Sequence, residues 1–304
     1  MELATAILTV AGLVLFETIT SIDNAIINAE VLNTMGARAK RWFLTWGIFI
    51  AVFLIRGALP WLIVWFSTPA LGPLGALTAT FSSDPAVIAA IEESTPILLI
   101  GGGTFLVFLF FHWIFLETKH YGLKIEKYIS LKGVWFFAVV SILLALIVWF
   151  ALEVNPMMAF SAVLGSTAFF IVHGFRANAE EQERRMLGSG MSDTSKLLYL
   201  EVIDATFSID SVIGAFAFTM SVPLIIIGCG IGAVIVRRLT MSNTETVKKY
   251  HYLKNWAMYS IFFLGTIMIL DSFGLHIPPY LSPLITFATV GFFYWKSVSE
   301  LKKP

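Results

Sequence analysis

The hydrophobic pattern of the chain is dominated by long apolar stretches separated by short polar connections. A helix needs roughly 20 apolar residues to cross the ~30 Å hydrocarbon core of a bilayer. We predict nine such spans, with the approximate boundaries 3–31, 42–66, 96–117, 133–152, 157–175, 197–220, 222–239, 256–274 and 280–297. The predicted fold class is therefore all-α: a polytopic membrane helix bundle with about nine transmembrane helices.

Basic residues alternate from one connection to the next. Arg38, Lys40 and Arg41 lie between spans one and two, whereas the long connection 67–95 contains acidic residues and no Lys or Arg. Basic residues also follow spans three, five and seven. Because positively charged loops face the cytoplasm, this pattern predicts an external N-terminus and a cytoplasmic C-terminus, in a bacterial inner membrane.

Composition supports the membrane assignment. The chain has 304 residues, of which 58% are hydrophobic and only 13% are charged, whereas soluble domains average about 25% charged residues. The net charge is zero, so nothing favours nucleic acid as a partner, and the lipid bilayer is the expected surrounding. The single cysteine, Cys229, excludes an intramolecular disulfide, and we interpret it as a small core residue.

Two of the predicted spans contain pairs of carboxylates six residues apart: Glu17 with Asp23, and Asp204 with Asp210. Both stretches contain the tripeptide Ser-Ile-Asp. A mid-membrane Asp costs roughly 2.5–3.5 kcal/mol, so four buried acids oppose insertion by about 10–14 kcal/mol. A cost of that size indicates function.

The two carboxylate spans begin five spans apart, so they cross the membrane in opposite directions. A second match follows each: Gly47 stands nine residues before Arg56, and Gly228 nine residues before Arg237. Inverted internal repeats with the site at their interface are common in secondary transporters. The inversion places Arg56 towards the outside and Arg237 towards the inside; alternatively, Arg237 with Arg238 is only a cytoplasmic anchor.

We therefore predict three regions. The first half, 1–152, holds spans one to four and an external insertion at about 67–95; a linking span and cytoplasmic loop occupy 153–196; the inverted second half is 197–304. Within the insertion, Asp84 and Pro85 form a helix start, as N-cap and first helical residue. The helix that they begin is expected to lie on the membrane or to re-enter it.

The oxygen-rich side chains of the two stretches suit hard cations. Magnesium, calcium and manganese favour carboxylate, amide and hydroxyl ligands, whereas zinc and copper usually recruit His or Cys. Residues six apart on a regular helix are separated by about 9 Å, so helix unwinding is required if both acids of a pair bind one ion. The same acids can take protons, and Arg56 and Arg237 can pair with them in an empty site.

His112, within span three, is interpreted as a hydrogen-bonded interior residue.

At these residues the sequence resembles the TerC family of integral membrane proteins, within the wider LysE-type transporter group. The matching features are Glu17 with 21–24, Asp204 with 207–211, and the inverted halves. The resemblance implies export of a divalent metal, most often manganese, with calcium as a further substrate. It implies a metal site made of Glu17, Asp23, Asn24, Asp204, Asp210 and Ser211; further candidates are Thr20, Ser21, Glu201, Ser208, Arg56 and Arg237.

The sequence thus predicts a manganese exporter that works by alternating access with proton coupling. It is not expected to be an enzyme or to hold a prosthetic group, and the divalent cation, Mn or Ca, is its substrate. A calcium/proton antiporter, a membrane-embedded metal-dependent enzyme and a non-transporting scaffold stay open as alternatives, and a homo-oligomer is compatible with each. No His-Glu-x-x-His, nucleophile elbow or phosphate-binding loop supports an enzyme. An amino-acid exporter would need a positive site, which four midplane acids argue against.

Overall fold

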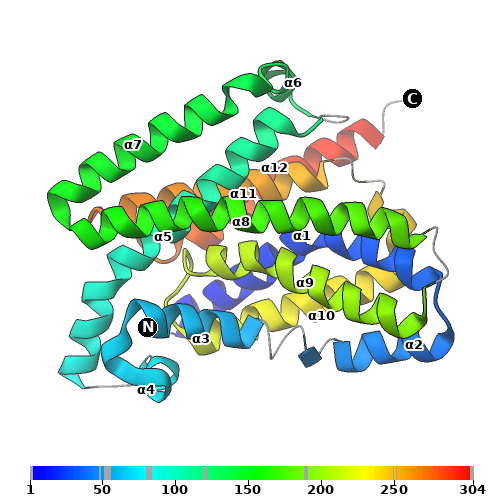
Figure 1. Cartoon of the computed structure of the whole chain (residues 1–304), viewed down its shortest axis with the longest axis horizontal. Helices are drawn as coiled ribbons and strands as arrows, with labels where there is room; N and C mark the ends of the chain where they lie inside the picture. Colours follow the sequence, from blue (N-terminus) through cyan, green and yellow to red (C-terminus); the bar gives the residue numbers. More distant parts are fainter. Residues whose placement is uncertain are drawn as a thin grey trace.

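A computed structural model describes residues 3–47, 49–50, 56–79, 84–118, 122–187, 191–248, 250 and 252–301. Within these ranges the protein is all-α, with helices and no strands, which confirms the predicted fold class (Figure 1). The main helices are α1 (Leu3–Asn33), α2 (Ala37–Trp42), α3 (Arg56–Ser67), α4 (Gly72–Thr78), α5 (Pro85–Leu116), α6 (Lys124–Ser130), α7 (Phe136–Val154), α8 (Pro156–Leu187), α9 (Asp193–Ala215), α10 (Val222–Lys248), α11 (Leu253–Ser272) and α12 (Leu281–Leu301). A π-helical segment, η1 (Phe43–Gly47), follows α2.

Among the described residues, six helical segments are long and apolar enough to cross a membrane: Leu3–Ile22, Pro85–Leu116, Gly133–Val154, Pro156–Arg176, Val222–Leu239 and Leu253–Ser272. The pair Arg56–Ser67 and Pro69–Thr78, bent by 105°, adds a seventh if it forms one broken span. The chain is therefore a multi-pass membrane protein. Helix α9 covers the predicted span 197–220 as far as Ala215, and α12 covers the predicted span 280–297 from Leu281. Neither is among the segments apolar enough to cross a membrane, so the count of nine stays a prediction for them.

Two of the expected boundaries are corrected by the structure. The predicted span 42–66 is not one regular α-helix, because its residues Phe43–Gly47 form the π-helical segment η1. The predicted external helix is not a separate element either. Asp84 is its N-cap, with Oδ1 accepting from the backbone N–H of Ala86 at 2.9 Å, but the helix continues through the span to Leu116 as α5.

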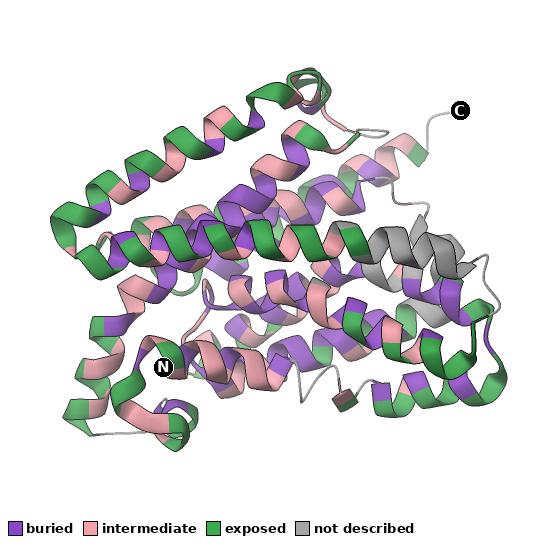
Figure 2. Cartoon of the chain, in the orientation of Figure 1, coloured by how far each residue is buried: buried purple, intermediate pink, exposed green. Residues whose placement is uncertain are grey.

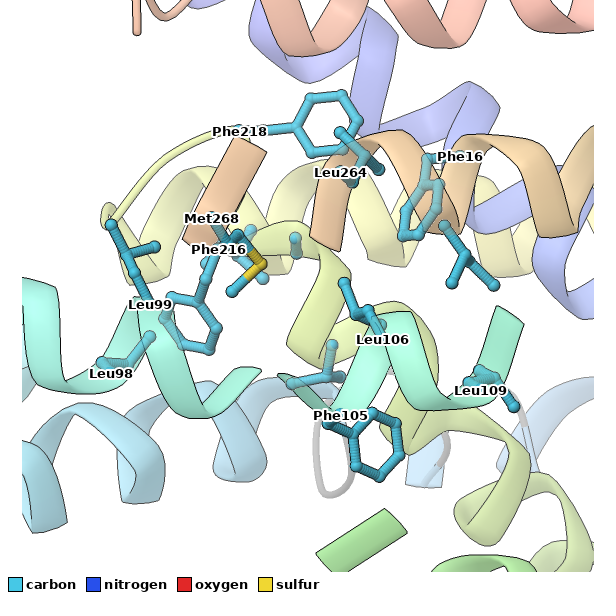
Figure 3. Close-up of a cluster of buried hydrophobic side chains, with 14 of the residues drawn as sticks. Phe16, Leu98, Leu99, Phe105, Leu106, Leu109, Phe216, Phe218, Leu264 and Met268 are labelled. Atoms are coloured by element: carbon cyan, nitrogen blue, oxygen red, sulfur yellow. The ribbon is translucent and has the colours of Figure 1, made fainter. Parts of the chain in front are cut away.

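The hydrophobic core lies where α1, α5, α9 and α11 meet. Figure 3 shows side chains from these helices and from the turn after α9 packing together, among them Phe16, Leu98, Phe105, Phe216, Phe218, Leu264 and Met268. Many residues of the peripheral helix α7, by contrast, are exposed (Figure 2), and they include large apolar residues. In a membrane protein such a face contacts lipid.

Helices α1 and α9 run in opposite directions. At one end, the backbone N–H of Gly36, just after α1, donates to Asp193 Oδ2 at the start of α9, at 3.0 Å. At the other end, Gly12 of α1 lies against the ring of Phe218, just after α9. The two carboxylate helices are therefore antiparallel, as the predicted inversion requires (Figure 1).

Glycines allow α5 to approach its neighbours closely. A Cβ atom on Gly165 of α8 would collide with the carbonyl oxygen of Gly101 on α5, and one on Gly265 of α11 would lie 2.9 Å from Leu106 Cβ. Small residues at helix interfaces are the usual means of close packing in membranes. The contact of α5 with α8 and α11 thus depends on side-chain size.

We expect Gly165→Ala to destabilise the protein by roughly 1–3 kcal/mol, the usual cost of overpacking. Gly174→Ala, on the same helix, is the matched control, since a Cβ there meets nothing within 4 Å. Unfolding of both variants in detergent would be compared with wild type. Equal unfolding midpoints for the two variants would show that the α5–α8 contact is not tight.

Candidate functional site

Five charged side chains meet where α1, α3, α9 and α10 cross. They are Glu17 of α1, Arg56 at the start of α3, Glu201 and Asp204 of α9, and Arg237 of α10, and all five are buried. Glu17 is 0% exposed and Arg56 only 2%. Buried charges are tolerated only when they are paired, and we call this group the five-charge cluster.

Arg56 bridges two of the carboxylate helices. Its Nη2 and Nε lie 2.7 and 2.9 Å from Glu17 Oε1, and its Nη1 lies 3.5 Å from Asp204 Oδ2. The hydroxyl of Ser21, one turn further along α1, donates to the same Glu17 Oε1 at 2.6 Å. One oxygen of Glu17 thus accepts from both α1 and α3.

Arg237 closes the other side of the five-charge cluster. Its Nη2 lies 3.2 Å from Asp204 Oδ2 and 3.7 Å from Glu201 Oε2. Its Nη1 donates to the backbone carbonyl of Phe43 at 3.0 Å, and its guanidinium carbon stands 4.2 Å from the centre of the Phe43 ring. Phe43 belongs to η1, and short π-helical segments are frequent at functional sites.

Two glycines make room for the charged side chains. A Cβ on Gly232 of α10 would lie 2.7 Å from Glu17 Cβ, and a Cβ on Gly47 of η1 would collide with Glu201 Oε1. One turn before Gly232, Gly228 packs in the same way against Leu13 of α1. The glycines that mark the predicted repeat thus serve close helix approach at the site.

The charges of the cluster do not balance, since three carboxylates face two guanidinium groups. Glu17 Oε2 and both oxygens of Glu201 have no hydrogen-bond partner among the described residues. Beside Asp204 and the two arginines lies a void of about 20 Å³, whose lining also includes Ser21 and Asn28. The side-chain oxygen of Asn28 also lacks a hydrogen-bond partner in the described part of the chain. A void of this size holds about one water molecule.

The structure thus brings together Glu17, Ser21, Arg56, Glu201, Asp204 and Arg237 among the candidates from the sequence. Arg237 is buried and paired, so it is more than a cytoplasmic anchor. Arg56 and Arg237 lie close together, because both approach the same oxygen, Asp204 Oδ2; that Arg56 lies towards the outside and Arg237 towards the inside stays a prediction. The predicted pairing of both arginines with the acids is present.

The other candidates lie apart or make local contacts. Ser208 and Ser211 are buried, but their hydroxyls donate to backbone carbonyls of α9, at 2.5 and 3.0 Å. Thr20 donates to the carbonyl of Phe16 at 2.9 Å. The side chains of Asp23 and Asn24 lie outside the described part of the structure.

Asp210 belongs to a second, partly buried ion pair rather than to the five-charge cluster. Its Oδ2 lies 2.6 Å from Nη2 of Arg176 on α8. Because α9 continues without a break from Asp193 to Ala215, Asp210 stands about 9 Å further along the helix axis than Asp204. Helix α1 is also unbroken, so the unwinding that a shared ion would require is not present.

Sequence reasoning missed the residues beside this second pair. The rings of His112 and His173 lie 3.8 Å apart, so a second histidine is also inside the bundle. His173 and Arg176 are three residues apart near the end of a predicted span. That spacing puts them on one helix face, which was the available signal.

The described residues contain no group of three or more His, Cys, Asp or Glu side chains placed to hold a metal ion. In this arrangement the arginines engage Glu17 Oε1 and Asp204 Oδ2. Cys229 is buried in the hydrophobic core, as predicted.

The fold and the site define a multi-pass, all-α membrane protein with a buried cluster of opposite charges at the crossing of four helices. The chain belongs to the family described as protein of unknown function (DUF475), whose sequence profile matches residues 22–303. Searches of the curated proteins and of the solved structures gave no match.

We expect Arg237→Gln to destabilise the protein by about 3–5 kcal/mol, because it leaves buried carboxylates without their partner. Arg238→Gln is the matched control: Arg238 is the next residue of α10 but is exposed, and such surface changes usually stay within about 0.5 kcal/mol. Unfolding in detergent measures both. If the two substitutions have equal effects, the pairing of Arg237 does not hold in the protein.

Proposed function

We propose that this protein exports a divalent cation, manganese, by alternating access, and that Glu17, Glu201 and Asp204 bind the ion in transit. The observation that carries the proposal is the buried five-charge cluster with its water-sized void. Asp23 and Asn24 stay predicted ligands, whereas Asp210 is left out of the ion site because it stands about 9 Å further along the unbroken helix α9 than Asp204.

The donor set favours a hard cation. The cluster offers carboxylate oxygens together with the hydroxyl of Ser21 and the amide oxygen of Asn28, and such oxygens suit manganese, magnesium and calcium. Its excess of negative charge favours a cation over an anion. Among these ions, the resemblance of the paired acidic motifs to the TerC family supports manganese, with calcium as the alternative.

The size of the void favours an inorganic ion over an organic substrate. Pockets for organic ligands usually measure about 300–1,000 Å³, whereas this void measures about 20 Å³. The arginines do supply the positive groups that an amino-acid exporter would need. Both, however, are already paired with carboxylates inside the protein.

Access to the cluster differs on its two sides. Towards η1, the contact of Arg237 with Phe43 covers it. Beyond the far end of α3 lies a cavity of about 450 Å³, lined partly by hydroxyl groups and Glu92. By the predicted topology this cavity is external, so the arrangement is closed to the cytoplasm, as one state of an alternating-access cycle would be.

Transport assays in inside-out vesicles test the proposal. Uptake of manganese, calcium, magnesium and zinc would be measured with and without an imposed pH gradient. We expect manganese to accumulate, and Glu17→Gln and Asp204→Asn to lower the rate at least about tenfold, since each removes a charged ligand of the ion. Glu153→Gln, at the exposed end of α7, is the control and should transport normally.

The alternatives give different outcomes in this assay. If no ion moves while the purified protein still binds a metal stoichiometrically, transport is excluded and an enzyme or a scaffold takes its place. Calcium uptake without manganese uptake would instead identify a calcium/proton antiporter.

A further inference from the structure

A groove separate from the five-charge cluster lies between α2 and the first turns of α9. It measures about 450 Å³ and is lined by Arg38, Ala39, Trp42, Asp193, Thr194, Leu197 and Leu198. Its polar members are Arg38, Asp193 and Thr194; the others form an apolar wall. The groove is thus amphipathic, and none of the functions considered above uses it.

The depth of the groove in the bilayer follows from the helices. Gly232, which contacts Glu17, lies near the middle of the apolar span Val222–Leu239 of α10, so Glu17 stands close to the midplane. The end of α1 at Asn33 is sixteen residues further on, or at most roughly 24 Å from the midplane. Including its headgroups, a bilayer extends about 20–22 Å to each side, so α2 begins at headgroup level.

Helix α9, on the other side of the groove, allows the depth in the bilayer to be estimated in the same way. Asp204 shares the depth of Glu17, because Arg56 joins the two. Thr194 lies ten residues before Asp204, at most roughly 15 Å from the midplane, and Leu197 at most about 10 Å. The polar end of the groove therefore lies at the membrane interface, and its apolar wall reaches into the hydrocarbon layer.

The charge of the rim favours an anionic occupant. Arg38 is exposed and forms no ion pair with any residue that the structure describes. Lys40 and Arg41 add two positive charges on the same helix. Asp193 is the one acid of the lining, and its Oδ2 accepts from the backbone N–H of Gly36. Basic juxtamembrane pockets of this kind attract anionic lipid headgroups.

We propose that this groove binds a phospholipid with an anionic headgroup, whose phosphate contacts Arg38 and Thr194 and whose acyl chain lies along Trp42, Leu197 and Leu198. The lipid joins α2 to α9. Since η1 follows α2 directly and holds Phe43 against Arg237, the lipid stabilises the covered side of the five-charge cluster.

Lipid-dependent stability of the purified full-length chain tests this proposal without any transport measurement. Phosphatidylglycerol or phosphatidylcholine with identical acyl chains would be titrated into the detergent-solubilised protein, and the shift of the thermal midpoint recorded. We expect phosphatidylglycerol to raise the midpoint of the wild type more than phosphatidylcholine does. In Arg38→Ala, the apparent affinity for phosphatidylglycerol should fall about fivefold or more.

The matched control is Arg41→Ala, which removes the same charge from the same helix but does not line the groove; it should keep most of the affinity. Equal losses of affinity in the two variants would show that the effect comes from general surface charge, and would overturn the proposal. A shift of the same size with inorganic phosphate would identify a free-anion site, and no difference between the two lipids would exclude an anionic headgroup. Leu198→Asp, which places a charge on the apolar wall, should also weaken lipid binding while leaving any effect of phosphate unchanged.

Discussion

The ion pair of Arg56 with Glu17 and Asp204 is the interaction on which the arrangement of the central helices depends. Two buried carboxylates on different helices, α1 and α9, are tolerated because one guanidinium group from α3 lies between them. Taking charges out of water costs several kcal/mol per ion, and only close pairing offsets it. Burial of the acids and the crossing of these helices therefore depend on each other.

Close pairing in turn requires close backbones. Glu17 reaches the interior only because α10 presents Gly232 at that point, and Glu201 fits beside η1 only because residue 47 is glycine. In a membrane there is little hydrophobic driving force between helices, so packing and polar contacts decide how they associate. The same few positions thus determine both helix spacing and the location of the charges.

Much of this fold could be predicted from the sequence, because membrane-spanning helices are recognisable from their length and apolarity. The acids could be found too, since Glu17 and Asp204 interrupt apolar stretches. The pairing of these acids with arginines was harder to predict. Nothing local in the sequence says that Arg56 and Arg237 converge on one oxygen of Asp204, because helix rotation and tilt are set by packing. Likewise, the equal spacing of the two acid pairs suggested equal roles, yet Asp210 pairs with Arg176, a residue that lies on a different helix and at the end of its span.

Charge balance connects the observed cluster with the proposed export. Three carboxylates against two arginines leave one negative charge, which a single proton would neutralise. If a dication replaced Arg56 at Glu17 and Asp204, the ion together with Arg237 would neutralise the same three carboxylates without that proton. Because a net charge at this depth is costly, the protonated state without the ion and the ion-bound state without the proton, which are both neutral, are favoured over states that carry a net charge. Binding of the ion would then require both release of a proton and withdrawal of Arg56, which begins α3. Since α3 leads from the cluster to the cavity at its far end, movement of this one helix would link occupancy of the site to access from that side.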